Sequence, residues 1–249
     1  MRNFWKERTW LILIFLLASA SVYYLHYLIF RDAHHIFIYM IGDLGFLFLD
    51  VMLVVIVIEH LLNQREKNNR LNKLNMLISA FFSEVGHGLI RQFVFVIKNK
   101  EILQNLVFFD SRWQKNDFIQ ASKKIKAASI IVSINPTDLG DLRDYLLPKR
   151  DFLLSLLANP SLLEHEAFTN LLWSIFHLLE ELALRPEEMV DLPPSDLDHL
   201  NNDVKRVVVL LLETWINYVA HLKERYPFLF SLVVRINPFG ASPSPIITQ

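Results

Sequence analysis

The sequence predicts an all-α protein, in which a two-helix transmembrane hairpin is followed by a helical stalk and a cytoplasmic helical bundle. Three observations predict this class. Residues 1–62 contain two long apolar runs, the later chain has the periodicity of amphipathic helices, and proline and glycine fall mostly between the periodic segments. The hydrophobic share of 53% also exceeds that of ordinary soluble chains.

The two apolar runs cover residues 9–30 and 36–58. The first contains His26 but no Lys, Arg, Asp or Glu, and the second contains only the carboxylates of Asp43 and Asp50. A helix crosses a hydrocarbon core of about 30 Å with roughly 20 residues. Each run is therefore long enough to span a membrane, and residues 1–62 are predicted to form the hairpin.

The flanking charges predict how the hairpin is oriented, because Lys and Arg are retained on the cytoplasmic side during insertion. Only Arg31 lies between the runs, whereas basic residues flank both outer ends: Arg2, Lys6, Arg8, Arg65, Lys67, Arg70 and Lys73. We expect a protein integral to the cytoplasmic (inner) membrane, with its N-terminus and C-terminal domain in the cytoplasm. A signal peptide cut after Ala20 is the competing interpretation, but the apolar run continues to Phe30.

The same four basic residues after the second run are candidate contacts for anionic lipid headgroups. They are Arg65, Lys67, Arg70 and Lys73. The ordinary cytoplasmic flank of a membrane span is the simpler explanation for them. The lipid bilayer is a predicted partner in either case.

Residues 59–98 are predicted to form a stalk that resembles a coiled coil and loosens at Gly86 and Gly88. Its apolar positions advance by three and four residues and form one narrow stripe: Leu71, Leu74, Ile78, Phe81 and Val85. About two heptads are present, fewer than a coiled coil usually needs. The alternative is a helix that packs this stripe against its own domain.

Residues 99–237 are predicted to form a helical bundle, because proline, glycine and capping residues divide them into helical segments. Ser195 is the expected N-cap of the longest helix. The predicted helices are residues 117–134, 136–146, 148–159, 161–184, 196–225 and 227–235. Residues 238–249 contain glycine and prolines and are predicted to be a disordered tail.

Two segments carry a resemblance to a known family. They are KLNMLISAFFSEVG at residues 73–86 and NPSLLEHEAFTNLLWSIFHLLEEL at residues 159–182. Together they resemble a family of uncharacterised prokaryotic membrane proteins with two spans and a helical cytoplasmic domain. The resemblance covers most of the chain. It implies the architecture, and it implies no activity.

Asp43 and Asp50 are the candidates for an ion pathway. An ionised Asp in the middle of a span costs about 2.5–3.5 kcal/mol, so such residues usually face other helices or water. The seven-residue spacing places both on one helical face. Asp43 has the alternative role of N-cap for a span that begins at Leu44. For Asp50 the alternative is a hydrogen bond to Ser19, Ser21 or a partner helix.

No metal site and no cofactor are expected. The chain has no cysteine, and two polar stripes in the bundle lack the Glu-x-x-His order of di-iron bundles. The stripes are Glu166, Asn170, His177 and Glu181, and Glu213, Asn217 and His221. If they converged, the candidate ligands would be His177, Glu180, Glu213 and His221.

The sequence contains no catalytic signature. It predicts a non-enzymatic, homo-oligomeric membrane protein with a cytoplasmic interaction or sensory domain, whose partners are the bilayer, further copies of the chain and an unidentified cytoplasmic protein. The net charge of −1 predicts no attraction to nucleic acid. The alternative is a small cation or proton channel lined by the second span. It needs several copies, because two helices cannot enclose a pore.

Overall fold

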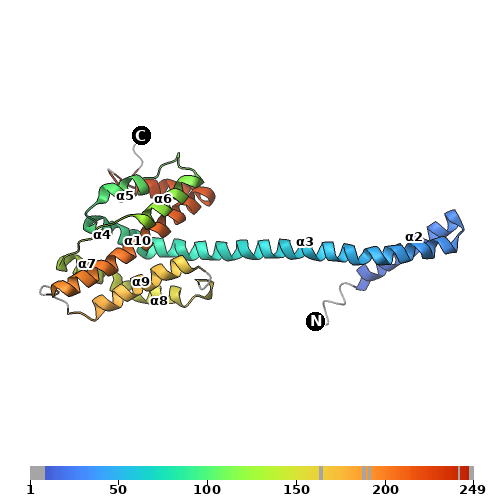
Figure 1. Cartoon of the computed structure of the whole chain (residues 1–249), viewed down its shortest axis with the longest axis horizontal. Coiled ribbons are helices and arrows are strands. Elements are labelled where there is room, and N and C mark those ends of the chain that lie inside the picture. Colours follow the sequence, from blue (N-terminus) through green and yellow to red (C-terminus); the bar gives the residue numbers. More distant parts are fainter. Residues whose placement is uncertain (1–8, 163–164, 187–188, 190–191, 241, 247–249) are drawn as a thin grey trace. The chain divides into compact units, whose positions relative to one another are not determined.

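The structure, a computed structural model, describes residues 9–162, 165–186, 189, 192–240 and 242–246. The described residues confirm the all-α prediction, because their regular elements are helices and their β-type pairing is limited to one isolated bridge between Ile97 and Val132. The chain divides into two compact units, Met1–Lys67 and Asn68–Gln249. Figure 1 shows the order of the helices.

The first unit contains helix α2, Thr9–Phe30, and the beginning of helix α3, Ala33–Phe81. Arg31 has a positive φ of 50° at the turn between them. Asp32 Oδ1 then accepts the backbone N–H groups of His34 at 2.9 Å and His35 at 3.3 Å, so it caps the start of α3. Arg2, Lys6 and Arg8, on which the predicted orientation partly depends, lie outside the described residues.

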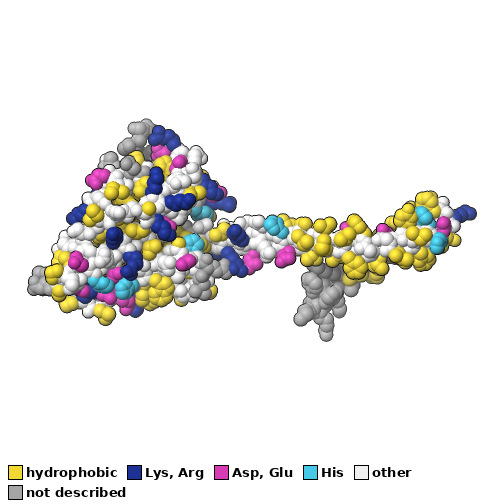
Figure 2. Space-filling model, viewed as in Figure 1, with side chains coloured by type: hydrophobic (Ala, Val, Ile, Leu, Met, Phe, Trp, Pro, Cys, Tyr) yellow, Lys and Arg dark blue, Asp and Glu magenta, His cyan; other side chains and the backbone are white. Residues whose placement is uncertain are grey.

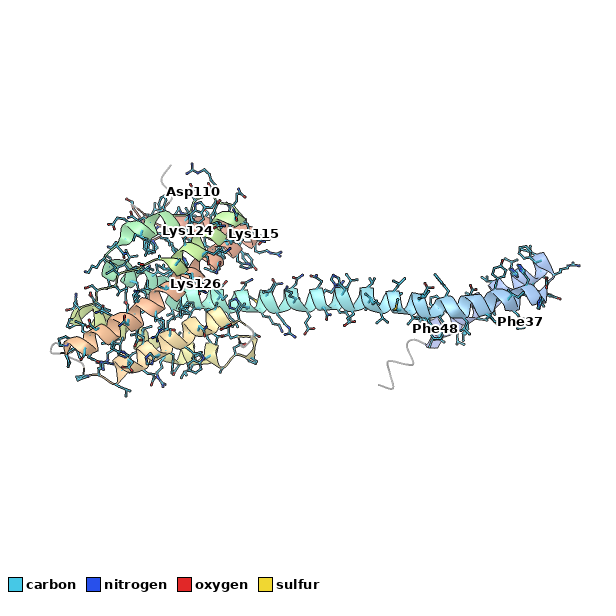
Figure 3. All side chains as sticks on the ribbon, viewed as in Figure 1. Phe37, Phe48, Asp110, Lys115, Lys124 and Lys126 are labelled. Carbon is cyan, nitrogen blue, oxygen red and sulfur yellow. The ribbon has the colours of Figure 1, made fainter. Side chains whose placement is uncertain are left out.

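Both helices are long and apolar enough to cross a membrane. Figure 2 shows their hydrophobic side chains at the molecular surface, and Figure 3 labels two of them on α3, Phe37 and Phe48. Phe48 is 73% exposed. Soluble monomers rarely expose contiguous apolar surface of this extent, and larger patches mark sites of contact with protein or membrane.

Asp43 is not an N-cap, which corrects one alternative from the sequence. Helix α3 begins at Ala33, and Asp43 lies within its regular hydrogen-bonded body. The cap is Asp32, one residue before the helix. Gly42 suggested a break in the chain, but a single glycine costs only about 1 kcal/mol within a helix and does not end it.

The apolar stripe of the predicted stalk, apart from the exposed Leu71, belongs to the core of the second unit. Leu74, Ile78, Phe81 and Val85 are buried there. Helix α3 passes into a π-helical turn, Phe82–Gly86, and then into α4, His87–Val96, so the glycines do not loosen the chain. The coiled-coil-like stalk is therefore wrong for these residues. The structure shows the alternative, a helix packed on its own domain.

The long helix α10 is the centre of the second unit. It spans Pro194–Arg225, buries Trp215, and contacts helices α4, α6, α9 and α11. Figure 1 shows it crossing between these helices. The other helices are α5 Lys100–Val107, α6 Lys115–Ala127, α7 Pro136–Leu146, α8 Arg150–Leu157, α9 Glu166–Ala183 and α11 Pro227–Arg235, with short 3-10 turns at Leu147–Lys149 and Pro160–Leu162.

Three local predictions need correction. The helix predicted for residues 117–134 ends at Ala127, because the β-branched residues after it run extended beside Ile97. The N-cap of α10 is Pro193 and not Ser195, because the helix already begins at Pro194, where the missing N–H of proline is not needed. The predicted disorder is wrong for the beginning of the tail, where Phe239 is buried against Trp215.

Candidate functional site

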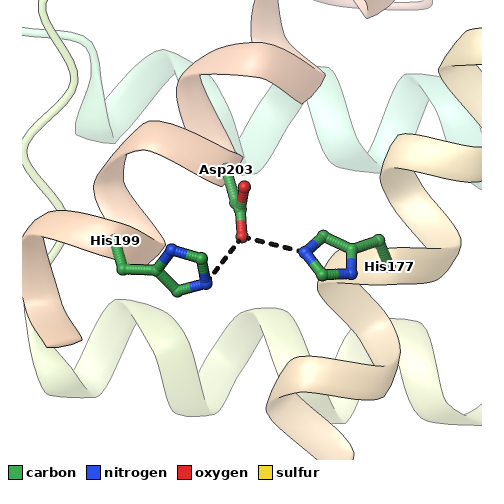
Figure 4. Close-up of side chains that lie close together, drawn as sticks. All are labelled: His177, His199 and Asp203. Atoms are coloured by element: carbon green, nitrogen blue, oxygen red, sulfur yellow. Dashed lines mark ion pairs between the residues drawn. The ribbon is translucent and has the colours of Figure 1, made fainter.

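Two imidazoles and a carboxylate meet between helices α9 and α10. His199 and Asp203 are four residues apart on α10 and share one face of it, while His177 reaches them from α9. Figure 4 shows the two rings on either side of the carboxylate. We call these three residues the His–His–Asp cluster.

The cluster has close and nearly symmetric geometry. Asp203 Oδ2 lies 3.3 Å from Nε2 of His177 and 3.3 Å from Nε2 of His199. One ligand atom from each residue lies within 4.8 Å of the other two. The Asp203 side chain is only 3% exposed, whereas the imidazoles are 46% and 50% exposed. The carboxylate thus forms the floor of a site that opens to solvent between the rings.

The two oxygens of Asp203 have different surroundings. Oδ1 is 3.3 Å from Nη1 of Arg206, three residues further along α10. Oδ2 is buried and, within the described part of the chain, forms no hydrogen bond of regular geometry. A buried carboxylate oxygen needs compensation by a cation or a donor. The cluster can supply this with protonated imidazoles or by holding a cation among its three ligand atoms.

A second charged group ties α9 to α10 near the cluster. Arg185 donates to Asp196 through Nε at 3.1 Å and Nη2 at 2.7 Å, and to Glu181 through Nη1 at 2.6 Å. These hydrogen bonds lower the pKa of both carboxyl groups below their ordinary values. For Glu181, the imidazoles of His177 and His199 add a smaller effect in the same direction.

The two polar stripes, whose convergence was the condition for a metal site in the sequence, do not converge. Glu180 pairs with Arg150 at 2.9 Å, and Glu213 lies 3.9 Å from Lys126. His221 is hydrogen-bonded to Asn75 at 3.2 Å. Of the four predicted candidates only His177 belongs to the cluster, and His199 and Asp203 were missed. Their spacing of four residues on a predicted helix was the available signal.

His221 instead lines a cavity between α6 and α10. The cavity has a volume of about 540 Å³ and combines apolar and charged walls, with Phe118 and Ile119 on α6 and His221 and Glu224 on α10. Burial lowers the pKa of His221, and the neighbouring Arg225 adds to this. Lys115, at the beginning of α6, also borders it and is labelled in Figure 3.

The remaining candidate residues from the sequence lie on the exposed surface of α3. Asp43 and Asp50 are both exposed, and among the described residues neither has a hydrogen-bond or ion-pair partner. Ser21 donates to the Leu17 carbonyl at 2.7 Å and does not bond to Asp50. The basic residues Arg65, Lys67, Arg70 and Lys73 are exposed on the same helix.

The chain matches known sequences along most of its length. Residues 70–235 match a family described as "Uncharacterized protein MJ1433, C-terminal helical domain", and residues 2–62 match "MJ1433, N-terminal helical domain". The chain is 41% identical over 229 residues to "Uncharacterized protein MJ1433" of Methanocaldococcus jannaschii, which covers 91% of this chain and 90% of that protein. No solved structure matches the chain.

Proposed function

The chain belongs to the family of uncharacterised MJ1433 proteins with helical domains, and from this premise we propose that it is a non-enzymatic, homo-oligomeric membrane protein. In this proposal the first unit is a transmembrane hairpin in the cytoplasmic membrane. The second unit is a cytoplasmic domain that binds a protein partner or senses a signal.

One observation carries this proposal, the continuity of helix α3. Its residues 36–58 are apolar and exposed, and the same uninterrupted helix then contributes Leu74, Ile78 and Phe81 to a buried core. Lipid is the simplest covering for the first segment, since about 20 apolar residues suffice to cross a bilayer. The second segment requires an aqueous domain. A membrane anchor joined to a soluble domain accounts for both.

The basic residues of α3 support a cytoplasmic position for the second unit. Arg65, Lys67, Arg70 and Lys73 are exposed and follow the apolar segment directly. Positive side chains in this position are retained on the cytoplasmic side and attract anionic headgroups. The bilayer is thus a proposed partner both through the apolar segment and through this basic stretch.

The exposed carboxylates of α3 support assembly into a homo-oligomer. Asp43 and Asp50 are separated by seven residues and lie on one face of the helix. Contact between this face and lipid is costly, whereas a second copy of the chain can cover it. The stripe from Leu74 to Val85 is already buried within the chain, so the proposed contacts between copies lie along the hairpin.

Topology reporters test the anchor directly. A reporter fused after Gln249 and one fused after Lys6 are each expected to be active in the cytoplasm, while a reporter inserted at Asp32 is expected to be active outside. Cross-linking in native membranes, through single cysteines introduced beside Asp50, is expected to give dimers or larger species. An external C-terminus, or a chain that washes off membranes with carbonate, contradicts the proposal.

The second candidate function is a small oligomeric cation or proton channel lined by the second span. The observation that favours it is Asp50, a carboxylate exposed within an apolar segment and lacking an intrachain partner among the described residues. Such a group suits a water-filled path. It equally suits a packed interface between copies, where only hydrogen bonding is needed.

The substitution Asp50→Asn separates the two functions, because it keeps the shape and hydrogen-bonding capacity of the side chain and removes its charge. The channel predicts cation or proton flux into vesicles containing the wild type and at least a tenfold loss in the variant. The interaction module predicts no flux from either protein and unchanged or greater oligomer stability in the variant. Asp144→Asn, at an exposed position of α7, is the matched control for the loss of one carboxylate charge outside the apolar segment.

A further inference from the structure

We propose that His177, His199 and Asp203 bind one divalent transition-metal ion of the Zn²⁺ class, through the two Nε2 atoms and Asp203 Oδ2. The proposal does not depend on the membrane function above, because all three ligands lie within the second unit. It rests on the ligand distances, on the types of donor atom and on the burial of the carboxylate.

The distances suit a tetrahedral ion. With bonds of about 2.0–2.1 Å, neighbouring ligand atoms around tetrahedral Zn²⁺ lie about 3.3 Å apart. Both Nε2 atoms lie 3.3 Å from Asp203 Oδ2. The two Nε2 atoms lie within 4.8 Å of each other, and both imidazoles are about half-exposed, so their rotation can bring all three ligand atoms around one ion.

The donor atoms select the kind of metal. Two imidazole nitrogens and one carboxylate oxygen are typical ligands of Zn²⁺ and of neighbouring divalent ions such as Co²⁺ and Ni²⁺. Ca²⁺ and Mg²⁺ prefer sites made of oxygen atoms. Three protein ligands leave one position of a tetrahedron vacant, and the half-exposed rings place that position toward solvent. Water or a ligand from another molecule can occupy it.

The carboxylate of Asp203 is held in an orientation that suits a metal ligand. Arg206 approaches Asp203 Oδ1 at 3.3 Å, which leaves Oδ2 as the atom directed toward the two rings. Asp203 is 3% exposed, and Oδ2 forms no regular hydrogen bond within the described residues. Outer contacts of this kind orient a metal ligand and are themselves important for affinity. A metal ion supplies the compensation that the buried oxygen lacks.

Metal binding would join α9 to α10 at a second place. Arg185 already connects these helices through Glu181 and Asp196, close to the chain segment that links them. His177 lies on α9, and His199 and Asp203 lie on α10, so an ion held by all three connects the two helices. A bound ion cross-links the pair and stabilises the folded chain by an amount that grows with the logarithm of the free ion concentration once the site is filled.

The experiment uses the full chain in detergent micelles, purified without a polyhistidine tag and stripped of metal with a chelator. Zn²⁺ is added in a calorimetric titration, and Co²⁺ in a parallel titration followed by its visible absorption. The expected result is one ion per chain, the absorption of tetrahedral Co²⁺, and a thermal midpoint that rises with Zn²⁺. His177→Gln and His199→Gln are each expected to weaken binding at least tenfold, since each removes one of three ligands.

His221→Gln is the matched control, because it makes the same change on α10 at a histidine outside the cluster. It is expected to bind Zn²⁺ like the wild type. Asp203→Asn provides a variant of nearly identical shape, and circular dichroism establishes that each variant is folded. The proposal is overturned if the wild type binds neither ion at micromolar concentration, or if His177→Gln and His199→Gln bind as the wild type does. Either result would show that the three residues form ion pairs and no metal site.

Discussion

The hydroxyl of Tyr145 donates a hydrogen bond of 2.8 Å to the backbone carbonyl of Val85, which joins helix α7 to the π-helical turn that follows α3. Gly88 makes this approach possible, because a Cβ at that position would overlap the Tyr145 ring and hydroxyl. The packing of α7 against α4, which contains Gly88, therefore requires that position 88 has no side chain.

Gly88→Ala is expected to lower the free energy of unfolding by about 1–3 kcal/mol, because the new methyl group displaces Tyr145, which is half-buried against the core. Gly140→Ala on α7 is the matched control. A Cβ there meets no atom within 4 Å, and alanine favours the helix by about 0.5–1 kcal/mol. Chemical unfolding of the full chain in detergent measures both. Equal effects of the two substitutions would show that Tyr145 does not restrict position 88.

His87 is expected to make the domain less stable in mild acid. Burial lowers its pKa below the ordinary value of 6.5, a hydrogen bond to the Phe82 carbonyl opposes this, and the nearby charge of Arg91 lowers it further. The unfolded chain thus takes up a proton at higher pH than the folded chain. The contribution of His87 to stability is complete above pH 6.5 and decreases as the pH falls through the lowered value.

Thermal midpoints measured in small steps from neutral pH to below 6.5 check this expectation. His87→Gln removes the titration and should flatten the decrease. His60→Gln, at an exposed position of α3, should leave the wild-type slope intact. An undiminished slope in His87→Gln would assign the acid sensitivity to other groups, among which His221 also has a pKa lowered by burial.

The hydrogen bonds of Arg185 are expected to stabilise the packing of α9 against α10 at neutral pH. Its hydrogen bonds lower the pKa values of Glu181 and Asp196 from their ordinary values of 4.5 and 3.8. The unfolded chain therefore binds these protons first as the pH falls. This stability is present above the ordinary values and is lost as the pH decreases through the lowered ones.

Arg185→Gln is expected to cost about 1 kcal/mol at pH 7, because the carboxylates are partly open to solvent. It should also remove part of the stability loss below pH 4.5. Arg185→Lys keeps the charge but not the two parallel hydrogen bonds to Asp196, so an intermediate result is expected. Unfolding curves at neutral and acid pH provide the test, and identical pH dependence in Arg185→Gln and wild type contradicts it.

Asn237 is expected to fix the start of the C-terminal tail. It is 2% exposed, donates through Nδ2 to the Val107 carbonyl at 2.7 Å, and accepts the Phe239 N–H at 3.0 Å. Asn237→Ala leaves both groups without these partners and should cost about 1–3 kcal/mol. Ser242→Ala, at an exposed tail position, should change stability by less than about 0.5 kcal/mol. Protease cleavage within the tail should accelerate only in the Asn237 variant.

The parts of the fold that follow from local chemistry could be predicted from the sequence. Pro136 and Pro227 begin helices α7 and α11, whose predicted bounds agree with the structure, because proline is compatible with the first turn of a helix and not with its interior. The extended residues after Ala127 were harder to assign. Their pairing with Ile97 depends on a segment about 30 residues earlier in the chain.

The sequence does not predict in the same way which helix faces and side chains pack against each other. Periodicity placed Leu74, Ile78 and Phe81 on one face of a helix, but it does not distinguish a second copy of the chain from the chain's own domain. The His–His–Asp cluster shows the same limit. His199 and Asp203 are paired by their spacing on α10, whereas His177 joins them only through the packing of α9 against α10.

The central position of α10 determines when the domain can close during synthesis. The helix contacts α4, α6, α9 and α11, yet it ends at Arg225, about 140 residues after Phe81 at the end of α3. At a translation rate of about 5–20 residues per second, the ribosome needs roughly 7–30 s to make that interval. The apolar side chains next to Phe81, such as Phe82, stay uncovered by α10 for this time, and those of α6 and α9 for shorter times. We expect nascent chains that stop before α10 to be bound by chaperones, and chains that extend past Arg225 to be released.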